Sequence, residues 1–283
     1  MNTLSLLLLV VAMPGAPASQ PAAPAPVEAD NAVGKVNIKL HSGEAQSILN
    51  SVLSNQGFWS DADVSSYDKQ LYDEIRLKKT DSGYVPMITG QGDEDFPLEV
   101  VADIVFRRNV DLPDKMSGAD AVVRLGSGYD STVGAEYHDS FYLLDFTLFY
   151  GHFTQRMYKK YDAENKQHIM WFEKLDQSFV NAGTWATYQK KIESTFESHD
   201  RRWLFNGYQE VTDVYGMFVV SPGESRQSRV TFVSKLSFGE GTGFIAQAGS
   251  KMPSVIRSGL KAGFDGCVEI AKDEKQKRLA KGQ

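Results

Sequence analysis

Residues 150–175 read YGHFTQRMYKKYDAENKQHIMWFEKL, and their pattern of apolar and polar residues predicts the central part of the fold. Consecutive side chains in its first half point to opposite faces of an extended chain. The two sets are Phe153, Gln155 and Met157 on one face, and His152, Thr154, Arg156 and Tyr158 on the other. The polar run 162–167 predicts a turn, and residues 168–175 predict the returning strand. We therefore expect an antiparallel β-hairpin here.

Further strands are predicted on either side of this hairpin. Residues 141–161 contain two antiparallel strands broken at Gly151, and Pro222-Gly223 marks a turn between two long strands. The predicted strands after the hairpin span residues 181–192, 203–220 and 226–238. Those before it span residues 33–40, 74–79, 98–107 and 121–125, with a helix over 45–52 after the first. The sequence from 141 to 238 thus predicts a continuous antiparallel meander.

A long amphipathic helix is predicted after the meander, beginning near Pro253, a residue that suits the first turn of a helix. Its apolar stripe consists of Met252, Ile256, Leu260, Gly263, Phe264, Cys267 and Ile270. A wide sheet twists and curls, and its concave face must be covered by another element. We expect this helix to provide the cover, which gives an α+β fold.

Four short motifs resemble the START-like superfamily, also called SRPBCC, near its coenzyme Q-binding START-domain and polyketide cyclase branch. They begin at Ile169-Met170-Trp171, Gly183-Thr184-Trp185, Arg229-Val230-Thr231 and Met252-Pro253-Ser254. The resemblance covers residues 151–271 and implies the helix-grip fold, in which a curled antiparallel sheet wraps around a long C-terminal α-helix. Between them, members of this superfamily hold sterols, phospholipids, isoprenoid quinones or polyketides. Many are carriers, and a minority are cyclases, hydrolases or dehydratases.

The resemblance implies a ligand site between the sheet and the C-terminal helix. The expected ligand-binding residues are His152, Arg156, Trp171, Trp185, Met252, Ile256, Leu260, Gly263 and Phe264. A solvated outer face explains His152 and Arg156 equally well, and strand tryptophans are core residues more often than ligand contacts.

No catalytic, metal or cofactor site is predicted. The single Cys267 lies on the apolar stripe, where a buried inert thiol is the norm, and the five histidines lack a zinc-binding spacing. The glycine groups match neither the dinucleotide fingerprint nor the phosphate loop. We therefore expect a carrier or sensor of a hydrophobic ligand. An enzyme of the cyclase or hydrolase type, or a ligand-free structural protein of the cell envelope, remains the alternative.

The two ends of the chain and its net charge predict its domain boundaries, its localisation and its partners. Residues 1–18 predict a signal peptide cut after Ala18, residues 19–32 an Ala/Pro-rich disordered linker, and residues 33–283 a single START-like domain. We expect export to the periplasm or the exterior, with an uncleaved N-terminal anchor as the alternative. The net charge of −6 argues against nucleic-acid binding. The lysine-rich tail 272–281 suggests either a solvated helix end or a transient membrane contact.

Overall fold

The computed structural model describes residues 38, 40, 43–53, 63–65, 72–80, 83–91, 98–111, 119–145, 150–199, 208–223, 228–238, 273, 276, 277, 280 and 281. All of them belong to one compact unit, Asn31–Gln283.

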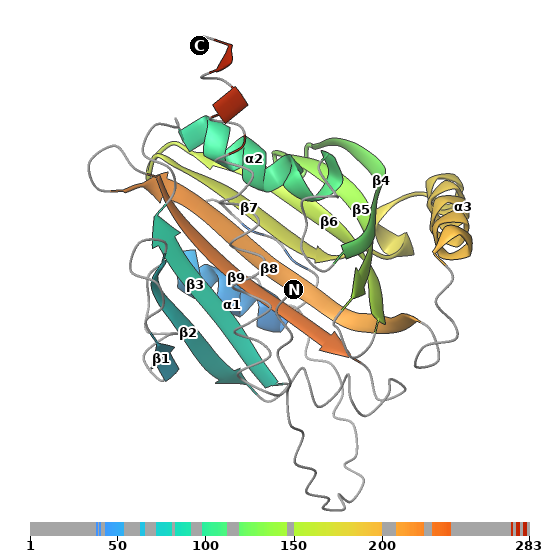
Figure 1. The fold of residues 1–283 in the computed structure, drawn as a ribbon, viewed down its shortest axis with the longest axis horizontal. Helices are drawn as coiled ribbons and strands as arrows, with labels where there is room; N and C mark the ends of the chain where they lie inside the picture. The colour runs from blue at the N-terminus through green and yellow to red at the C-terminus, as the bar shows by residue number, and fades with distance from the viewer. Residues whose placement is uncertain are drawn as a thin grey trace, which may run out of the picture. The chain divides into compact units, whose positions relative to one another are not determined.

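Nine strands of the described residues form one sheet (Figure 1). They are β1 (Asp63–Ser65), β2 (Tyr72–Thr80), β3 (Gly83–Gln91), β4 (Ala119–Asp130), β5 (Ala135–Asp145), β6 (Tyr150–Asp162), β7 (Gln167–Lys174), β8 (Tyr208–Pro222) and β9 (Ser228–Phe238). The order in space is β1-β2-β3-β9-β8-β7-β6-β5-β4, and neighbours in this order pair antiparallel. Strands that follow one another in the sequence are therefore neighbours in the sheet, apart from the junction between β3 and β9.

Strand β8 extends beyond the end of its neighbour β7. β8 is 15 residues long, whereas β7 has only 8 and ends at Lys174. Beyond that end, β8 pairs directly and in parallel with β6, where Tyr150 to His152 lie opposite Tyr208 to Glu210. The sheet bends around the end of β7 as a result.

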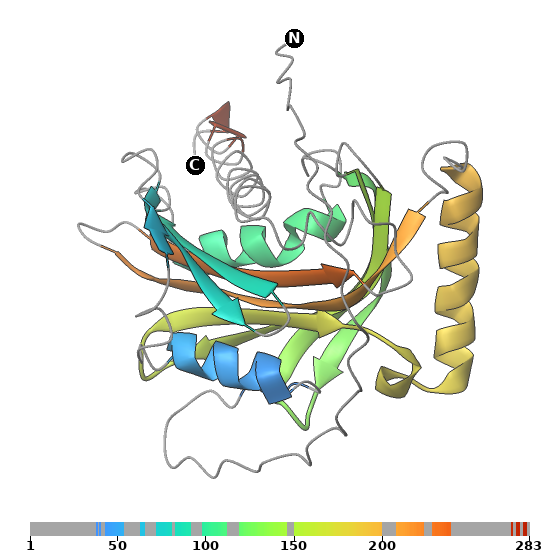
Figure 2. The same ribbon diagram turned by 90° about the horizontal axis from the view of Figure 1, so that it is seen from below.

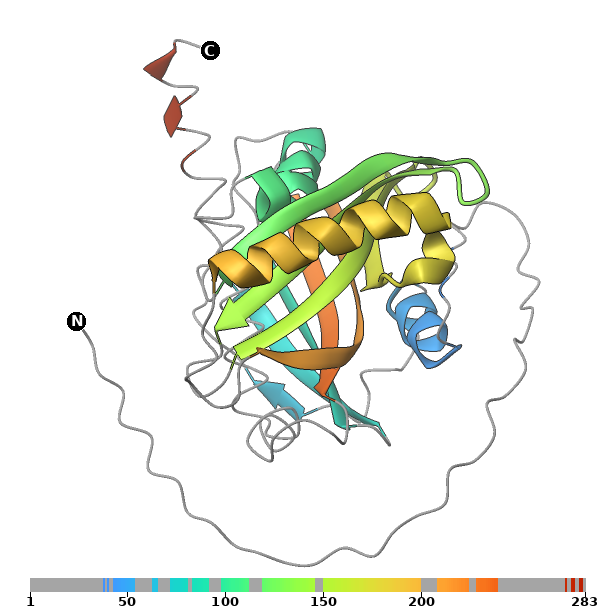
Figure 3. The same ribbon diagram turned by 90° about the vertical axis from the view of Figure 1, so that its right-hand side faces the viewer.

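The helices α1, α2 and α3 cover the two faces of the sheet (Figures 2 and 3). Helix α2 (Leu98–Asp111) packs on one face, which we call the α2 face. Helices α1 (Gly43–Leu53) and α3 (Ala182–Ser198) pack on the other, which we call the opposite face. A short 3-10 helix, η2 (Gln177–Phe179), connects β7 to α3. The elements are those of an α+β fold, as predicted.

Much of the predicted meander is confirmed. β6 and β7 form the hairpin around the turn at 163–166, and β2 and β4 contain the strands predicted at 74–79 and 121–125. β8 and β9 form the described parts of the strands predicted at 203–220 and 226–238. The break predicted at Gly151 is wrong, because Gly151 lies inside β6 and β5 ends at Asp145. The helix predicted over residues 45–52 is α1, whose Ala45 and Leu49 are buried.

Two predicted strands are helices instead. Residues 98–107 form most of α2, where Val101, Ala102, Val105 and Phe106 are buried and Asp103 and Arg107 are exposed. That spacing is the helical one, although the β-branched residues suggested a strand. Residues 181–192 likewise begin α3, so the meander is interrupted between β7 and β8.

Two further predictions have different outcomes. In the predicted strand 33–40, Ile38 and Leu40 lie outside any strand. Ile38 packs with α1 against the sheet, so its burial comes from an irregular segment. The predicted C-terminal helix, Met252 to Ile270, lies outside the described residues.

Candidate ligand-binding face of the sheet

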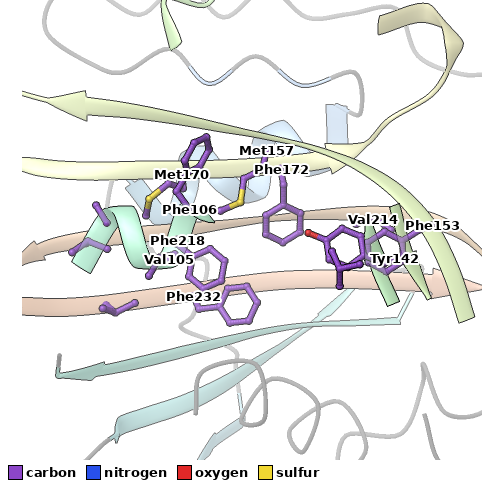
Figure 4. Close-up of a cluster of buried hydrophobic side chains, with 14 of the residues drawn as sticks. Val105, Phe106, Tyr142, Phe153, Met157, Met170, Phe172, Val214, Phe218 and Phe232 are labelled. Atoms are coloured by element: carbon purple, nitrogen blue, oxygen red, sulfur yellow. The ribbon is translucent and has the colours of Figure 1, made fainter. Parts of the chain in front are cut away.

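The α2 face has a continuous apolar wall built by six strands (Figure 4). Alternate residues of each strand point to it, and helix α2 adds Val101, Val105 and Phe106 across the wall. The largest buried side chains of its strands are Tyr142, Phe153, Met157, Met170, Phe172, Phe218 and Phe232. Such a surface matches the apolar lining of small-molecule sites.

Aromatic stacking orders parts of this wall. The Phe218 and Phe232 rings lie 4.0 Å apart and 2° from parallel, and Tyr142 stacks on Phe153 at 4.7 Å. Gly216 allows the close packing of Phe172, because a Cβ atom there would overlap both that ring and a backbone carbonyl. The stacked rings turn their faces toward each other, which fixes the orientation of both side chains in each pair.

A few polar groups interrupt the wall along β5. His138, Ser140 and Tyr142 alternate on this strand, and Gln155 of β6 lies directly opposite Ser140. The Ser140 hydroxyl donates to the Tyr142 oxygen at 3.2 Å, and His138 Nε2 lies 2.8 Å from the Phe106 carbonyl oxygen of α2. Buried hydroxyl and amide groups on an apolar wall can orient a ligand by hydrogen bonding.

Arg156, which the sequence offered as a ligand contact, lies on the opposite face in an ion pair. Its Nε and Nη2 atoms donate to the two carboxylate oxygens of Asp139 at 2.7 and 2.8 Å. The Tyr188 hydroxyl of α3 donates to the same carboxylate at 2.9 Å, and the guanidinium stacks 4.0 Å from the Tyr137 ring centre. Arg156 therefore ties β5, β6 and α3 together.

The electrostatics of this group follow from its burial. Burial opposes the charge of Arg156, but the hydrogen bonds and the charge of Asp139 outweigh that cost and raise the pKa of the guanidinium. Burial, with the nearby Asp139 carboxylate, also raises the pKa of Tyr188. Burial raises the pKa of Tyr158 to about 12. These phenols stay protonated and act as hydrogen-bond donors.

The ion pair is part of a longer polar row. Direct cross-strand pairing links one residue of each strand from β5 to β9. The row consists of Asp139, Arg156, Glu173, Tyr215 and Lys235, all of them buried. Two carboxylates and two cations alternate along it, so that its formal charge sums to zero.

The other described candidates also lie on the opposite face. His152 packs edge-on against Phe196 of α3, with ring centres 5.0 Å apart. Trp171 stacks on Tyr158 at 5.1 Å in the cluster covered by α1. Trp185 lies on α3, beside Tyr188. The structure thus brings none of the four onto the α2 face, and Met252, Ile256, Leu260, Gly263 and Phe264 lie outside the described residues.

The polar residues of the α2 face were not among the predicted ligand-binding residues. His138, Ser140 and Tyr142 occupy every second position of a strand, and this alternation was the available signal. Among the described residues no group of three or more His, Cys, Asp or Glu side chains is placed to hold a metal ion. No described helix has the length and apolarity to cross a membrane.

The curled antiparallel sheet with its covering helices has the START-like, helix-grip fold. Human STARD10 is similar with a TM-score of 0.52 at 8% identity, over 87% of each chain. The human StarD13 (DLC2) lipid transfer and protein localization domain is similar with a TM-score of 0.49 at 10% identity, over 82% of this chain and 98% of that one.

A STAR-related lipid transfer protein from Xanthomonas axonopodis gives a TM-score of 0.47 at 9% identity, over 75% of this chain and 98% of that one. No family model matches the sequence, and no curated protein matches it. The fold is therefore shared with proteins whose sequences are only 8–10% identical to this chain.

Proposed function

We propose that this chain binds a hydrophobic small molecule or lipid against the α2 face and acts as a carrier or sensor. The observation that carries the proposal is the buried aromatic and methionine wall with its strip of uncharged polar groups at Ser140, Tyr142 and Gln155. An apolar wall with few hydrogen-bonding groups suits a ligand that is mostly hydrocarbon and has one polar end.

The fold supports the same proposal. The resemblance to START-like proteins implies a ligand site between the sheet and a long C-terminal helix, and α2 packs on the face proposed here. The predicted helix Met252 to Ile270 would supply the remaining cover. Because the sequence also predicts a signal peptide, we propose that the ligand is bound outside the cytoplasm, with a lipid membrane as the source or destination.

Ligand capture tests the proposal directly. Native mass spectrometry of gently purified protein should show an additional mass of lipid size that denaturation releases. Incubation of the stripped protein with a phospholipid, a sterol and a quinone in turn should restore a bound species with at least one of them. A protein that carries no such mass, and takes up none of the three, would contradict the proposal.

A pair of matched variants locates the site. Gln155→Leu keeps the size of a side chain on the α2 face but removes its amide, and should weaken binding of a ligand with a polar end by about fivefold to tenfold. Trp171→Phe makes a similar conservative change on the opposite face and should leave binding unchanged. Equal effects of the two variants on binding would place the ligand elsewhere.

A further inference from the structure

The edge of the α2 face contains a cavity with a different chemistry. Its volume is 280 Å³, and it lies between α2 and the β4–β5 hairpin. The lining side chains that matter are Phe106 and Arg107 of α2, Arg124 and Ser127 of β4, and Glu136 and His138 of β5. Phe106 also belongs to the apolar wall, so the cavity adjoins the proposed ligand site.

A β-bulge gives the cavity its polar lining from β4. The pairing with β5 shifts between Arg124 and Gly126, so Arg124 lies opposite Ser140 and Ser127 lies opposite His138. Both partners point to the α2 face, which means that Arg124 and Ser127 do so as well. Without the bulge, residues three apart on a strand would point to opposite faces.

Helix α3 fixes this bulge from the opposite face. Lys191 Nζ donates to the carbonyl oxygens of Leu125 at 2.9 Å and Arg124 at 3.3 Å. Gly126 lets Tyr188 pack against the bulged backbone, because a Cβ atom there would overlap its hydroxyl. The position of the Arg124 backbone is therefore set before any ligand binds.

The second arginine, Arg107, lies on α2, and its position depends on how this helix packs. His138 lies under the helix and contacts it at the Phe106 carbonyl, 2.8 Å from Nε2, one residue before Arg107. Arg107 and Arg124 are both exposed, so a ligand group at the cavity mouth can reach them. The lining of the cavity therefore holds two guanidinium groups and one carboxylate, Glu136, in a chain whose net charge is −6.

We infer that this cavity binds the anionic end, a phosphate or a carboxylate, of the hydrophobic ligand. A guanidinium group matches the two oxygens of either anion, and the Ser127 hydroxyl adds a further donor. The cavity is too small for a whole lipid but accommodates a charged end group, while the tail continues along the wall that begins at Phe106. The inference rests on the proposed function and names the class of ligand: an acidic amphiphile.

The test compares two lipids with the same tails. Dioleoyl phosphatidic acid carries the phosphate that dioleoylglycerol lacks, and the parent protein should bind the acid at least about tenfold more tightly. The double variant Arg107→Gln, Arg124→Gln should lose this preference and still bind dioleoylglycerol like the parent. The control Lys166→Asn, Lys190→Gln removes two exposed cations elsewhere and should keep the preference.

The outcomes separate the two proposals. Equal affinity of the parent for both lipids, or an undiminished preference in the double arginine variant, overturns the anionic site while the carrier function stands. Failure of the parent to bind either lipid removes both. Inorganic phosphate that binds as tightly as phosphatidic acid also overturns the inference, because the anion would then be recognised without its tail. Melting temperatures of all variants should stay near that of the parent.

Discussion

Arg156 and Asp139 are buried together, and each compensates the charge of the other. Arg156→Met leaves the carboxylate of Asp139 in the interior without its cation, which should lower the free energy of unfolding by about 3–5 kcal/mol. Changing both partners, Arg156→Met with Asp139→Asn, removes both charges and keeps an acceptor for Tyr188, so it should cost less than the single change. Urea unfolding of the three proteins measures the difference.

The cost of the single change distinguishes two roles for Arg156. The sequence suggested a ligand contact, for which substitution would alter lipid selectivity more than stability. The observed ion pair predicts the reverse. A loss of unfolding free energy below about 1 kcal/mol in Arg156→Met, together with altered lipid selectivity, would contradict the structural role.

His168 is a buried histidine on the α2 face. Neither of its ring nitrogens has a hydrogen-bond partner among the described residues. Burial lowers the pKa of His168 below 6.5, and Lys159 lowers it further, against the opposing influence of Glu99 and Asp103. The folded protein therefore binds this proton less readily than the unfolded chain.

The lowered pKa of His168 sets the sign of the pH dependence of stability. Above about pH 6.5 the histidine is neutral in both states, and stability falls as the pH drops below that value because only the unfolded chain is protonated. His168→Phe should reduce this slope by up to about 1.4 kcal/mol per pH unit between pH 6.5 and 5. Urea titrations at several pH values test it, and an unchanged slope in the variant would exclude His168 as the cause.

The other groups with shifted pKa values do not obscure the contribution of His168 between pH 6.5 and 5. His152 has a pKa lowered by burial, so it contributes a slope of the same sign that remains in the His168 variant. Asp130 and Glu210 have pKa values lowered below 3.8 and 4.5, chiefly by hydrogen bonds from Thr132 and Lys174. The stability they supply is lost only at lower pH.

Among the elements, helix α3 depends on the glycine it packs against. Gly126→Ala adds a methyl group where the Tyr188 hydroxyl lies, so it should destabilise the protein by about 1–3 kcal/mol. Gly183→Ala, within α3 itself, meets only ordinary contact with Asn181 and should be neutral or stabilising by up to about 1 kcal/mol. Thermal melts of both variants provide the comparison, and equal melting temperatures would show that α3 tolerates displacement.

The same helix shows where sequence patterns failed. Trp185, Tyr188, Ile192 and Phe196 recur every three or four residues, and the Asn181 side chain accepts from the Thr184 N–H as an N-cap. Both signals were present, but the strands on either side favoured reading this segment as one more strand. Strand β6 was predictable from its two-residue period, and β7 was predictable as the strand that returns after the polar turn.

The site was less predictable than the sheet. Alternation placed Arg156 and Gln155 on opposite faces correctly, yet nothing in one strand tells which face receives α2. That depends on segments far away in the sequence, since Phe106 of α2 contacts β5. The cavity depends on a bulge at Arg124 to Gly126, which leaves no distinctive mark in the composition.

For the molecule as a whole, the predicted signal peptide leads to the prediction that is simplest to check. If residues 1–18 are a signal peptide, the exported protein begins at Ser19, and its intact mass should correspond to residues 19–283. Expression with the leader intact, followed by separation of soluble and membrane fractions, gives the measurement. Full-length chains that sediment with membranes would favour the uncleaved anchor.

The polar row from Asp139 to Lys235 also affects how the chain reaches its fold. Each of the five strands that contribute to it has one polar group that must lie beside the next. If a strand paired one position out of step, its polar residue would turn toward the apolar wall, and its neighbours would lose their partners. Mispaired sheets would thus carry an uncompensated buried charge in most cases. The row makes such errors costly, so it should favour correct assembly during refolding and disfavour compact misfolded forms.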